Sequence, residues 1–256
     1  MKLISFDIQA DFAFFRKPET NNTINLSYNI IHRPAALGIL GAIIGLSGYK
    51  EKGKLPEYYE KLREVKIGIE PLNHDKGSYS KTNIKYSNTV GYANKGSNFL
   101  TEELTLINPG YRIYLLLNLE NAYHNQLYHF IKNGEAEYIP YLGKNEFTAW
   151  WNQDSVKEYS YIQKQISKEE RIKIKTIFQK EIVLKGNTEV PFPDLLNLDF
   201  EEVNFLYFER LPKDFDLELM QYDISEYAFS NYYINNAHVI EGLFFIQELN
   251  AYVQLL

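Results

Sequence analysis

The fold is decided by residues 33–46, which read RPAALGILGAIIGL. Pro34 suits the first position of a helix, because the amide that proline lacks would have no intrahelical partner there. We therefore expect a helix from Pro34 to about Leu46, ending before Gly48. Each of the glycines at 38, 41 and 45 costs about 1 kcal/mol of helix propensity, so another element must approach closely. A buried helix packed flat on a sheet is the simplest explanation.

The order of the elements around this helix indicates the fold class. Aromatic and β-branched runs bounded by turn residues predict strands. The expected strands are Lys2–Gln9, Phe12–Arg16, Val65–Ile69, Tyr111–Asn118 and Tyr138–Leu142, with a loop at Pro18–Asn29 and a second helix at Asn121–Lys132. Helices interleaved with mostly antiparallel strands predict an α+β fold with a ferredoxin-like sheet over residues 1–150. Residues 151–256 are mainly strands and are expected to form a β-rich C-terminal part.

A long polar segment interrupts the first part. Residues 72–99 contain four lysines, one acid and three tyrosines, with almost no aliphatic side chains. Loops of this length in a compact domain are usually functional or disordered. We predict a protruding arm over about residues 72–110, and a merely flexible loop is the alternative. Lysines that follow a phosphate backbone and tyrosines that stack on bases make Lys76, Lys81 and Lys85 candidate RNA contacts.

Charge divides the chain in two. The net charge is −6, but residues 1–118 carry 15 Lys and Arg against 11 Asp and Glu, whereas residues 119–256 carry 12 against 22. The two parts therefore have net charges of +4 and −10. This asymmetry indicates one face for a polyanion and another for protein or solvent, unless the clustering is chance.

Several function classes are disfavoured. Cysteine is absent, which removes disulfides and thiolate sites and favours a reducing cytoplasm. The longest apolar run, residues 35–46, has 12 residues, whereas a bilayer span needs roughly 20, so no membrane passage is expected. His124 and His129 are five residues apart, which is not a helical metal-binding spacing. No nucleophile elbow, P-loop or dinucleotide fingerprint occurs, so we expect no catalytic site, no metal and no cofactor.

Basic residues lie where elements begin or end. Arg16 and Lys17 end a predicted strand, and His32 and Arg33 directly precede the helix. Free amides and the helix dipole favour a phosphate at such a helix start. Tyr111, Arg112 and Lys144 also lie at predicted strand ends. Together with the arm lysines, these residues are the predicted RNA-binding set.

Two motifs resemble a known family. Residues 14–18 (FFRKP), a polar loop, and then residues 33–46 resemble the N-terminal signature of the CRISPR-associated Cas-five family. Residues 141–147 (YLGKNEF) follow the Asn108–Asn118 strand at the spacing seen in that family. The likeness covers about residues 1–150 and is closest to the type I-B branch.

The resemblance implies a specific role. It implies a ferredoxin-like (RRM-like) palm with a β-hairpin thumb, present once in the Cascade surveillance complex. There the family holds the 5′ handle of the guide RNA (crRNA), caps the filament of Cas-seven subunits and contacts the large subunit. Target DNA is then recognised indirectly, through base pairing with the guide, in antiviral defence. Arg16, Lys17, His32 and Arg33 match positions near the handle, and Tyr111, Arg112 and Lys144 are expected in the same groove.

Two other function classes stay open. The type I-C branch of the family cleaves the repeat RNA itself with a Tyr, a Lys and a His, and Tyr49 lies where that tyrosine would be. This chain contains no Lys-His dipeptide, so the proton transfer for a metal-independent endoribonuclease lacks its groups. A plain protein-interaction domain is the third class, against which the basic arm argues.

Overall fold

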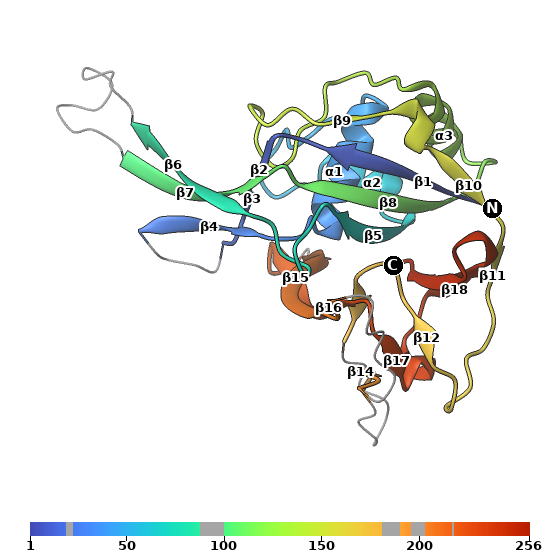
Figure 1. Cartoon of the computed structure of the whole chain (residues 1–256). Coiled ribbons are helices and arrows are strands. Elements are labelled where there is room, and N and C mark those ends of the chain that lie inside the picture. The colour runs from blue at the N-terminus through green and yellow to red at the C-terminus, as the bar shows by residue number, and fades with distance from the viewer. Residues whose placement is uncertain (19–22, 88–99, 181–189, 196–202, 217) are drawn as a thin grey trace, which may run out of the picture.

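The computed structural model describes residues 1–18, 23–87, 100–180, 190–195, 203–216 and 218–256. Its centre is an antiparallel sheet with three helices (Figure 1). The sheet has the order β10 (Lys157–Tyr159), β1 (Lys2–Gln9), β8 (Gly110–Leu117) and β5 (Lys66–Leu72), with β9 (Trp150–Trp151) also paired to β1. The helices are α1 (Arg33–Ile43), α2 (Glu57–Leu62) and α3 (Ala122–Asn133). The predicted α+β class is confirmed, and the central sheet continues past residue 150 into β10.

Side-chain alternation gives the central sheet two buried faces. On one face, Ile4 and Phe6 of β1 join Leu37 and Leu40 of α1 in the main core. On the other face, Leu3 of β1 packs with residues of the C-terminal strands β18 (Leu243–Ile246) and β19 (Ala251–Gln254). The chain after β10 therefore covers the side of the sheet that the helices leave open.

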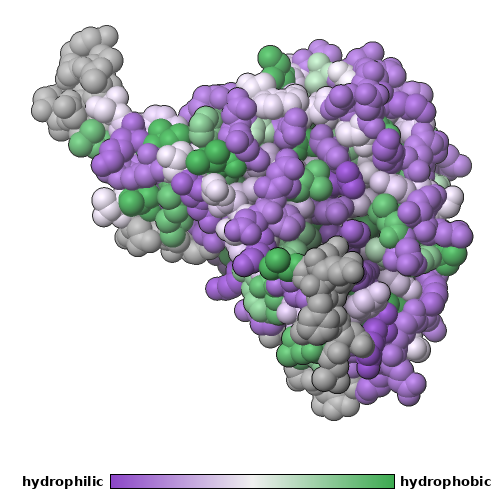
Figure 2. Space-filling view, viewed as in Figure 1, coloured by the Kyte–Doolittle hydropathy of each residue, from purple (hydrophilic) through white to green (hydrophobic). Residues whose placement is uncertain are grey.

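A second sheet forms the arm that projects to the left in Figure 1. It contains β2 (Phe12–Ala13), β7 (Leu100–Ile107), β4 (Ile24–Tyr28) and β3 (Phe15–Arg16), and β6 (Lys81–Ser87) pairs with β7 as an antiparallel hairpin. The protruding arm is thus a hairpin over its described residues, and residues 88–99 lie outside them. Figure 2 shows it standing out from the body with apolar side chains among polar ones.

The C-terminal part is rich in strands, as expected from the sequence, and most of them are short. They form three small sheets: β11 (Tyr161–Ile162), β18 (Leu243–Ile246) and β19 (Ala251–Gln254); β12 (Ile172–Lys173), β17 (Tyr233–Asn235) and β14 (Phe192–Pro193); and β13 (Phe178–Gln179), β16 (Gln221–Ser230) and β15 (Leu206–Asp216). The long β15–β16 hairpin packs against α1.

Two predicted elements are wrong. The expected loop at residues 18–29 contains β4, whose alternating Ile24-Asn25-Leu26 pairs in parallel with β7. The expected strand at residues 138–142 is irregular apart from a single bridge between Tyr141 and Thr148, and β10 takes the sheet position that it would have filled. Both segments take their structure from pairing with strands that are distant in sequence, and local composition carries no information on such pairing.

Helix α1 was predicted correctly but its glycines have a different role. It ends at Ile43, and Gly45, with φ +78°, follows its C-cap in the left-handed conformation, so Gly48 is not the stop. A Cβ on Gly41 would lie 2.3 Å from the Tyr58 Cβ, and one on Gly38 would touch the Tyr58 ring. The glycines therefore admit the tyrosine of α2 and do not face the sheet.

Candidate nucleic-acid interface

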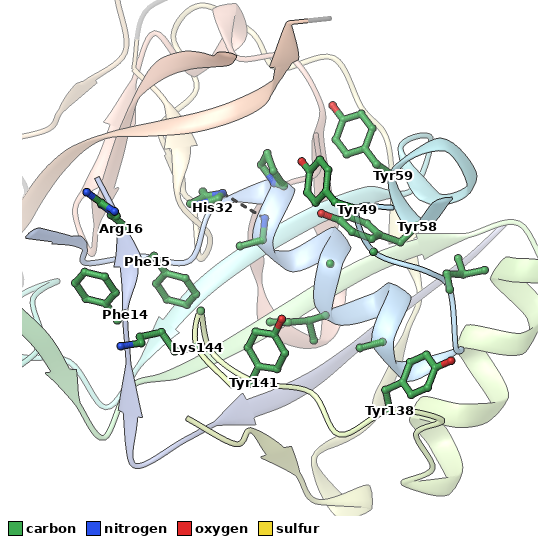
Figure 3. Close-up of a pocket in the computed structure, with 18 of the residues that line it drawn as sticks. Phe14, Phe15, Arg16, His32, Tyr49, Tyr58, Tyr59, Tyr138, Tyr141 and Lys144 are labelled. Atoms are coloured by element: carbon green, nitrogen blue, oxygen red, sulfur yellow. Dashed lines mark hydrogen bonds between the residues drawn. The ribbon is translucent and has the colours of Figure 1, made fainter. Parts of the chain in front are cut away.

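An open groove of about 920 Å³ runs along the exposed side of α1 (Figure 3). We call it the aromatic groove, because nine described tyrosine and phenylalanine rings from five parts of the chain line it together with Arg16, His32 and Lys144. The rings are Phe14, Phe15, Tyr49, Tyr58, Tyr59, Tyr138, Tyr141, Phe215 and Tyr222, and Glu103 and residues of α1 and its flanking loops complete the wall. Grooves of this size that combine apolar rings with a few polar groups are typical ligand sites.

Several of these rings are open to solvent. Tyr49 is 63% exposed, Tyr138 is 55% exposed and Tyr141 is 42% exposed. Tyr58 is held between α1 and its neighbouring tyrosines, and burial raises its pKa, so its hydroxyl stays protonated. Exposed aromatic faces that cannot be packed elsewhere are platforms on which flat ligands such as bases can stack.

Arg16 and Lys144, the described cations at the groove, differ in the ion pairs and hydrogen bonds that their side chains form. Arg16 is exposed on β3, and the described part of the chain offers it no hydrogen bond or ion pair. Lys144 lies 2.7 Å from Glu103 and 3.0 Å from Glu146, with its ammonium 4.0 Å from the centre of the Tyr86 ring. Burial opposes the charge of Lys144, but its hydrogen bonds to the two carboxylates prevail and raise its pKa. Arg16 is therefore the better candidate for a phosphate.

His32 forms the N-cap of α1 and lies deep in the groove. Its Nδ1 accepts a hydrogen bond of 3.2 Å from the Ala35 amide, and the Ala36 amide donates to the His32 carbonyl. Pro34 has no amide, and the His32 side chain satisfies the Ala35 amide, one of the donors that the start of a helix leaves free. The phosphate site expected at this helix start is thus already occupied by the chain's own cap.

The C-terminal hairpin supplies one wall of the groove and is fixed by a buried carboxylate. Glu209 of β15 accepts hydrogen bonds from the amides of Asn29 (3.0 Å) and Ile30 (3.1 Å) and pairs with Lys17 at 2.9 Å. Its side chain is only 4% exposed. Phe215 and Tyr222, farther along the same hairpin, line the groove. Lys17, predicted to bind RNA, therefore holds the hairpin against the start of α1.

Three other predicted residues face elsewhere. Arg33 donates to the backbone carbonyls of Arg63, Val65 and Leu256, away from the groove. Tyr111 is fully buried, and its hydroxyl donates to the Asn29 carbonyl at 3.0 Å. Arg112 forms a two-point ion pair with Asp7 at 2.7 and 2.8 Å. Adjacent residues of a strand point to opposite faces, so Tyr111 and Arg112 cannot line one groove.

The arm lysines lie outside the groove as well. Lys81 and Lys85 are exposed on one face of β6, and Lys85 pairs with Glu102 at 2.9 Å. Lys76 is in a tight turn at the base of the arm, where φ is positive at both Lys76 and Gly77. Gly77 packs against Tyr207 of β15. The structure therefore brings together Arg16, His32 and Lys144, and leaves Lys76, Lys81 and Lys85 outside the groove.

Sequence reasoning missed most of the aromatic groove. Tyr58, Tyr138 and Tyr222 carried no motif, although 21 tyrosines in 256 residues is an unusual supply. The family resemblance relates Tyr49 only to the tyrosine of the type I-C nuclease. The one available signal was the cluster of tyrosines directly after the glycine-containing helix.

Comparison with solved structures identifies the fold. A CRISPR protein from Archaeoglobus fulgidus matches with a TM-score of 0.53 and 13% identity, over 99% of this chain and 98% of that one. The chain has the fold of a CRISPR protein. A Cas protein (TM-score 0.45, 9% identity, 94% of this chain and 98% of that one) and a chain from a CRISPR RNA-guided surveillance complex (0.49, 11%, 90% and 91%) are also similar. No family model and no curated protein matches the sequence.

The sequence resemblance to CRISPR proteins is thereby confirmed at the level of the fold. Identities near 10% do not distinguish one branch from another, so type I-B stays a prediction. Among the described residues, no helix is long and apolar enough to cross a bilayer.

Proposed function

We propose that the chain is a non-catalytic, cytoplasmic member of the Cas-five family, closest to type I-B. In this proposal it binds the 5′ handle of the crRNA within Cascade, caps the Cas-seven filament and contacts the large subunit. Target DNA is engaged indirectly, through the guide. The shared CRISPR fold supports the proposal, and the observation that carries it is the aromatic groove with Arg16 at its edge.

The element order supports a ferredoxin-like palm. Strand β1, helix α1, strands β5 and β8, helix α3 and strand β10 follow one another as β-α-β-β-α-β, and the sheet order is β10-β1-β8-β5. The β6–β7 hairpin is then the thumb. In this arrangement the C-terminal strands cover the open face of the palm sheet, so RNA is left with the helix side and the thumb.

The groove's chemistry suits single-stranded RNA. Proteins that bind single strands combine a basic track with aromatic rings, and each stacked base contributes about 1–3 kcal/mol by alanine substitution. Exposed Tyr49 and Tyr141 supply the rings, Arg16 supplies a cation at the groove, and Lys81 and Lys85 supply cations on the arm. A chain of net charge −6 can bind RNA this way, because stacking needs no excess of positive charge.

The test uses the complex co-expressed with its guide RNA. Tyr141→Ala and Arg16→Ala should each lower guide occupancy, and the Arg16→Ala loss should change with salt because a phosphate contact releases counterions. Lys157→Ala, which removes an exposed cation of β10 that does not line the groove, is the matched control and should behave as the parent. Guide occupancy that is unchanged in both groove variants across a salt series would refute the proposal.

We also propose that the chain does not cleave RNA. His32 is the histidine that lines the same groove as Tyr49, but its Nδ1 is already bonded to Ala35 and burial lowers its pKa to about 3. A general base works best with a pKa near the working pH, so His32 is poorly suited to take the 2′-hydroxyl proton. A single cut in the repeat RNA that Tyr49→Phe abolishes would favour the endoribonuclease instead.

A further inference from the structure

The protonation state of His32 is fixed by its surroundings. The side chain is 6% exposed, and burial lowers its pKa to about 3, so the ring is neutral at physiological pH. Its Nδ1 accepts the Ala35 amide hydrogen at 3.2 Å and therefore cannot carry a proton. A neutral imidazole carries one proton, which leaves it on Nε2. His32 is thus a permanent hydrogen-bond donor through a single known atom.

This donor has no partner among the described residues. No hydrogen bond to Nε2 is found there, and Nε2 is not one of the fully buried polar atoms, so it reaches solvent. The His32 ring meets the rings of Phe15 (6.2 Å between centres), Tyr28 (5.5 Å) and Tyr222 (5.5 Å) edge to face. Phe15 lies near His32 at the aromatic groove (Figure 3), and Tyr222 lines the same groove. His32 also lines a second cavity of about 20 Å³, which is too small for a ligand, so the groove is the space in which a ligand can meet this ring.

The surroundings of the donor indicate what it binds. Because Nε2–H reaches solvent and has no partner among the described residues, it is available to an acceptor that a ligand supplies. The described groove cations, Arg16 and Lys144, belong to β3 and the 138–144 loop, whereas the rings around His32 are neutral. A neutral donor flanked by stacking surfaces matches the acceptor edge of a flat, uncharged heterocycle better than a phosphate.

We propose that His32 reads a nucleobase: its Nε2–H donates a hydrogen bond to an acceptor atom of one unpaired base seated in the aromatic groove. Tyr49 and Tyr141 are exposed rings of the same groove on which such a base can stack, and Arg16 takes the adjoining phosphate. This inference rests on the proposed RNA-binding function and adds the contact that orients one base.

Two variants separate the donor from the structural role of His32. His32→Asn keeps an N-cap of the preferred kind but has no Nε2–H. His32→Phe keeps a ring of similar volume but has neither the cap nor the donor. Both are purified as the full chain and checked for folding by thermal unfolding. The probe is a fluorescein-labelled RNA octamer of non-repeating sequence, together with its eight single-abasic forms, and binding is followed by fluorescence anisotropy.

We expect both variants to bind the octamer about three- to tenfold more weakly, the range for one neutral hydrogen bond. Their salt dependence should equal that of the wild type, whereas Arg16→Ala should lower the slope of log K against log salt by about one. Removing one particular base from the octamer and introducing either His32 variant should each reduce the binding free energy. Their combined effect should be smaller than the sum of the two, because both changes remove the same hydrogen bond.

The outcomes distinguish the inference from the function beneath it. Two results would refute the contact between His32 and a base but leave the proposed RNA binding intact. One is a loss of binding free energy that is additive with the variants at every abasic position. The other is a slope of log K against log salt that falls by about one in the His32 variants. No measurable binding of the octamer, or of the guide in the complex, would overturn both.

Discussion

The Glu209 contact gives the sharpest test of how the C-terminal part serves the groove. Glu209→Ala removes a carboxylate that is 4% exposed and that holds two backbone amides and Lys17 at 2.9–3.1 Å. Each amide left unpaired costs about 1–3 kcal/mol, and breaking a buried ion pair typically costs about 3–5 kcal/mol. These contributions overlap, so we expect the free energy of unfolding to fall by about 3–5 kcal/mol.

Urea unfolding followed by tryptophan and tyrosine fluorescence measures this loss. Glu226→Ala is the matched control, because Glu226 lies on the same hairpin but forms only an exposed ion pair with Lys180 at 3.2 Å. A pair of that kind contributes about 0–1 kcal/mol. Glu209→Gln should fall between the two, because one amide oxygen can still accept while its NH₂ group opposes the donors.

A functional consequence accompanies the stability loss. Phe215 and Tyr222 belong to the hairpin that Glu209 anchors, so RNA affinity should also drop in Glu209→Ala at temperatures where the chain is still folded. An unfolding free energy for Glu209→Ala within about 1 kcal/mol of the Glu226→Ala value would refute the reasoning. It would mean that the hairpin is held by its apolar contacts alone.

Three further predictions concern pH, catalysis and the arm. His32 has a folded pKa of about 3 against 6.5 unfolded, so the unfolded state takes up a proton first and stability falls as pH drops below 6.5. By linkage, His32 lowers the free energy of unfolding at pH 5 by about 2 kcal/mol. The variant His32→Asn should abolish this pH-dependent loss, whereas the exposed control His129→Asn should retain it. Purified protein should leave its repeat RNA intact for hours on a gel, and Tyr49→Phe should change nothing. The double variant Lys81→Ala and Lys85→Ala should change the melting temperature by no more than about a degree or two, because exposed ion pairs contribute little to stability. The same variant should weaken assembly of the guide-bound complex at raised salt. A large shift in melting temperature would show that these lysines are structural.

Local sequence signals predicted the elements that depend on local physics. Helix α1 was visible from Pro34 and its run of aliphatics, and the arm was visible from its lysines and tyrosines. The partner of the helix glycines was not, because Tyr58 belongs to a six-residue helix that has no long periodic pattern. Short elements of this kind are fixed by packing, so they appear only when the chain is folded.

The groove depends on contacts that no local pattern could report. Glu209 meets Asn29 across 180 residues of sequence, and Tyr222 meets His32 across a similar span. Alternation along β8 could have separated Tyr111 from Arg112, since consecutive strand residues face opposite sides. That alternation is a local signal, unlike the contacts that form the groove.

Most of the cations predicted to bind RNA are already paired within the chain, and this changes the kind of RNA binding that we expect. Among the described residues, Lys17, Arg112 and Lys144 each pair with a carboxylate of the chain, and Arg33 is bound to backbone carbonyls. Phosphate contacts would have to compete with these pairs and with the Lys85–Glu102 pair on the arm, so Arg16 and Lys81 are the charges most readily available. Binding that relies on few phosphates releases few counterions and has a shallow salt dependence. Affinity must then come mainly from stacking on exposed tyrosines, which is why removing a ring should weaken binding by more than removing any one of the paired lysines.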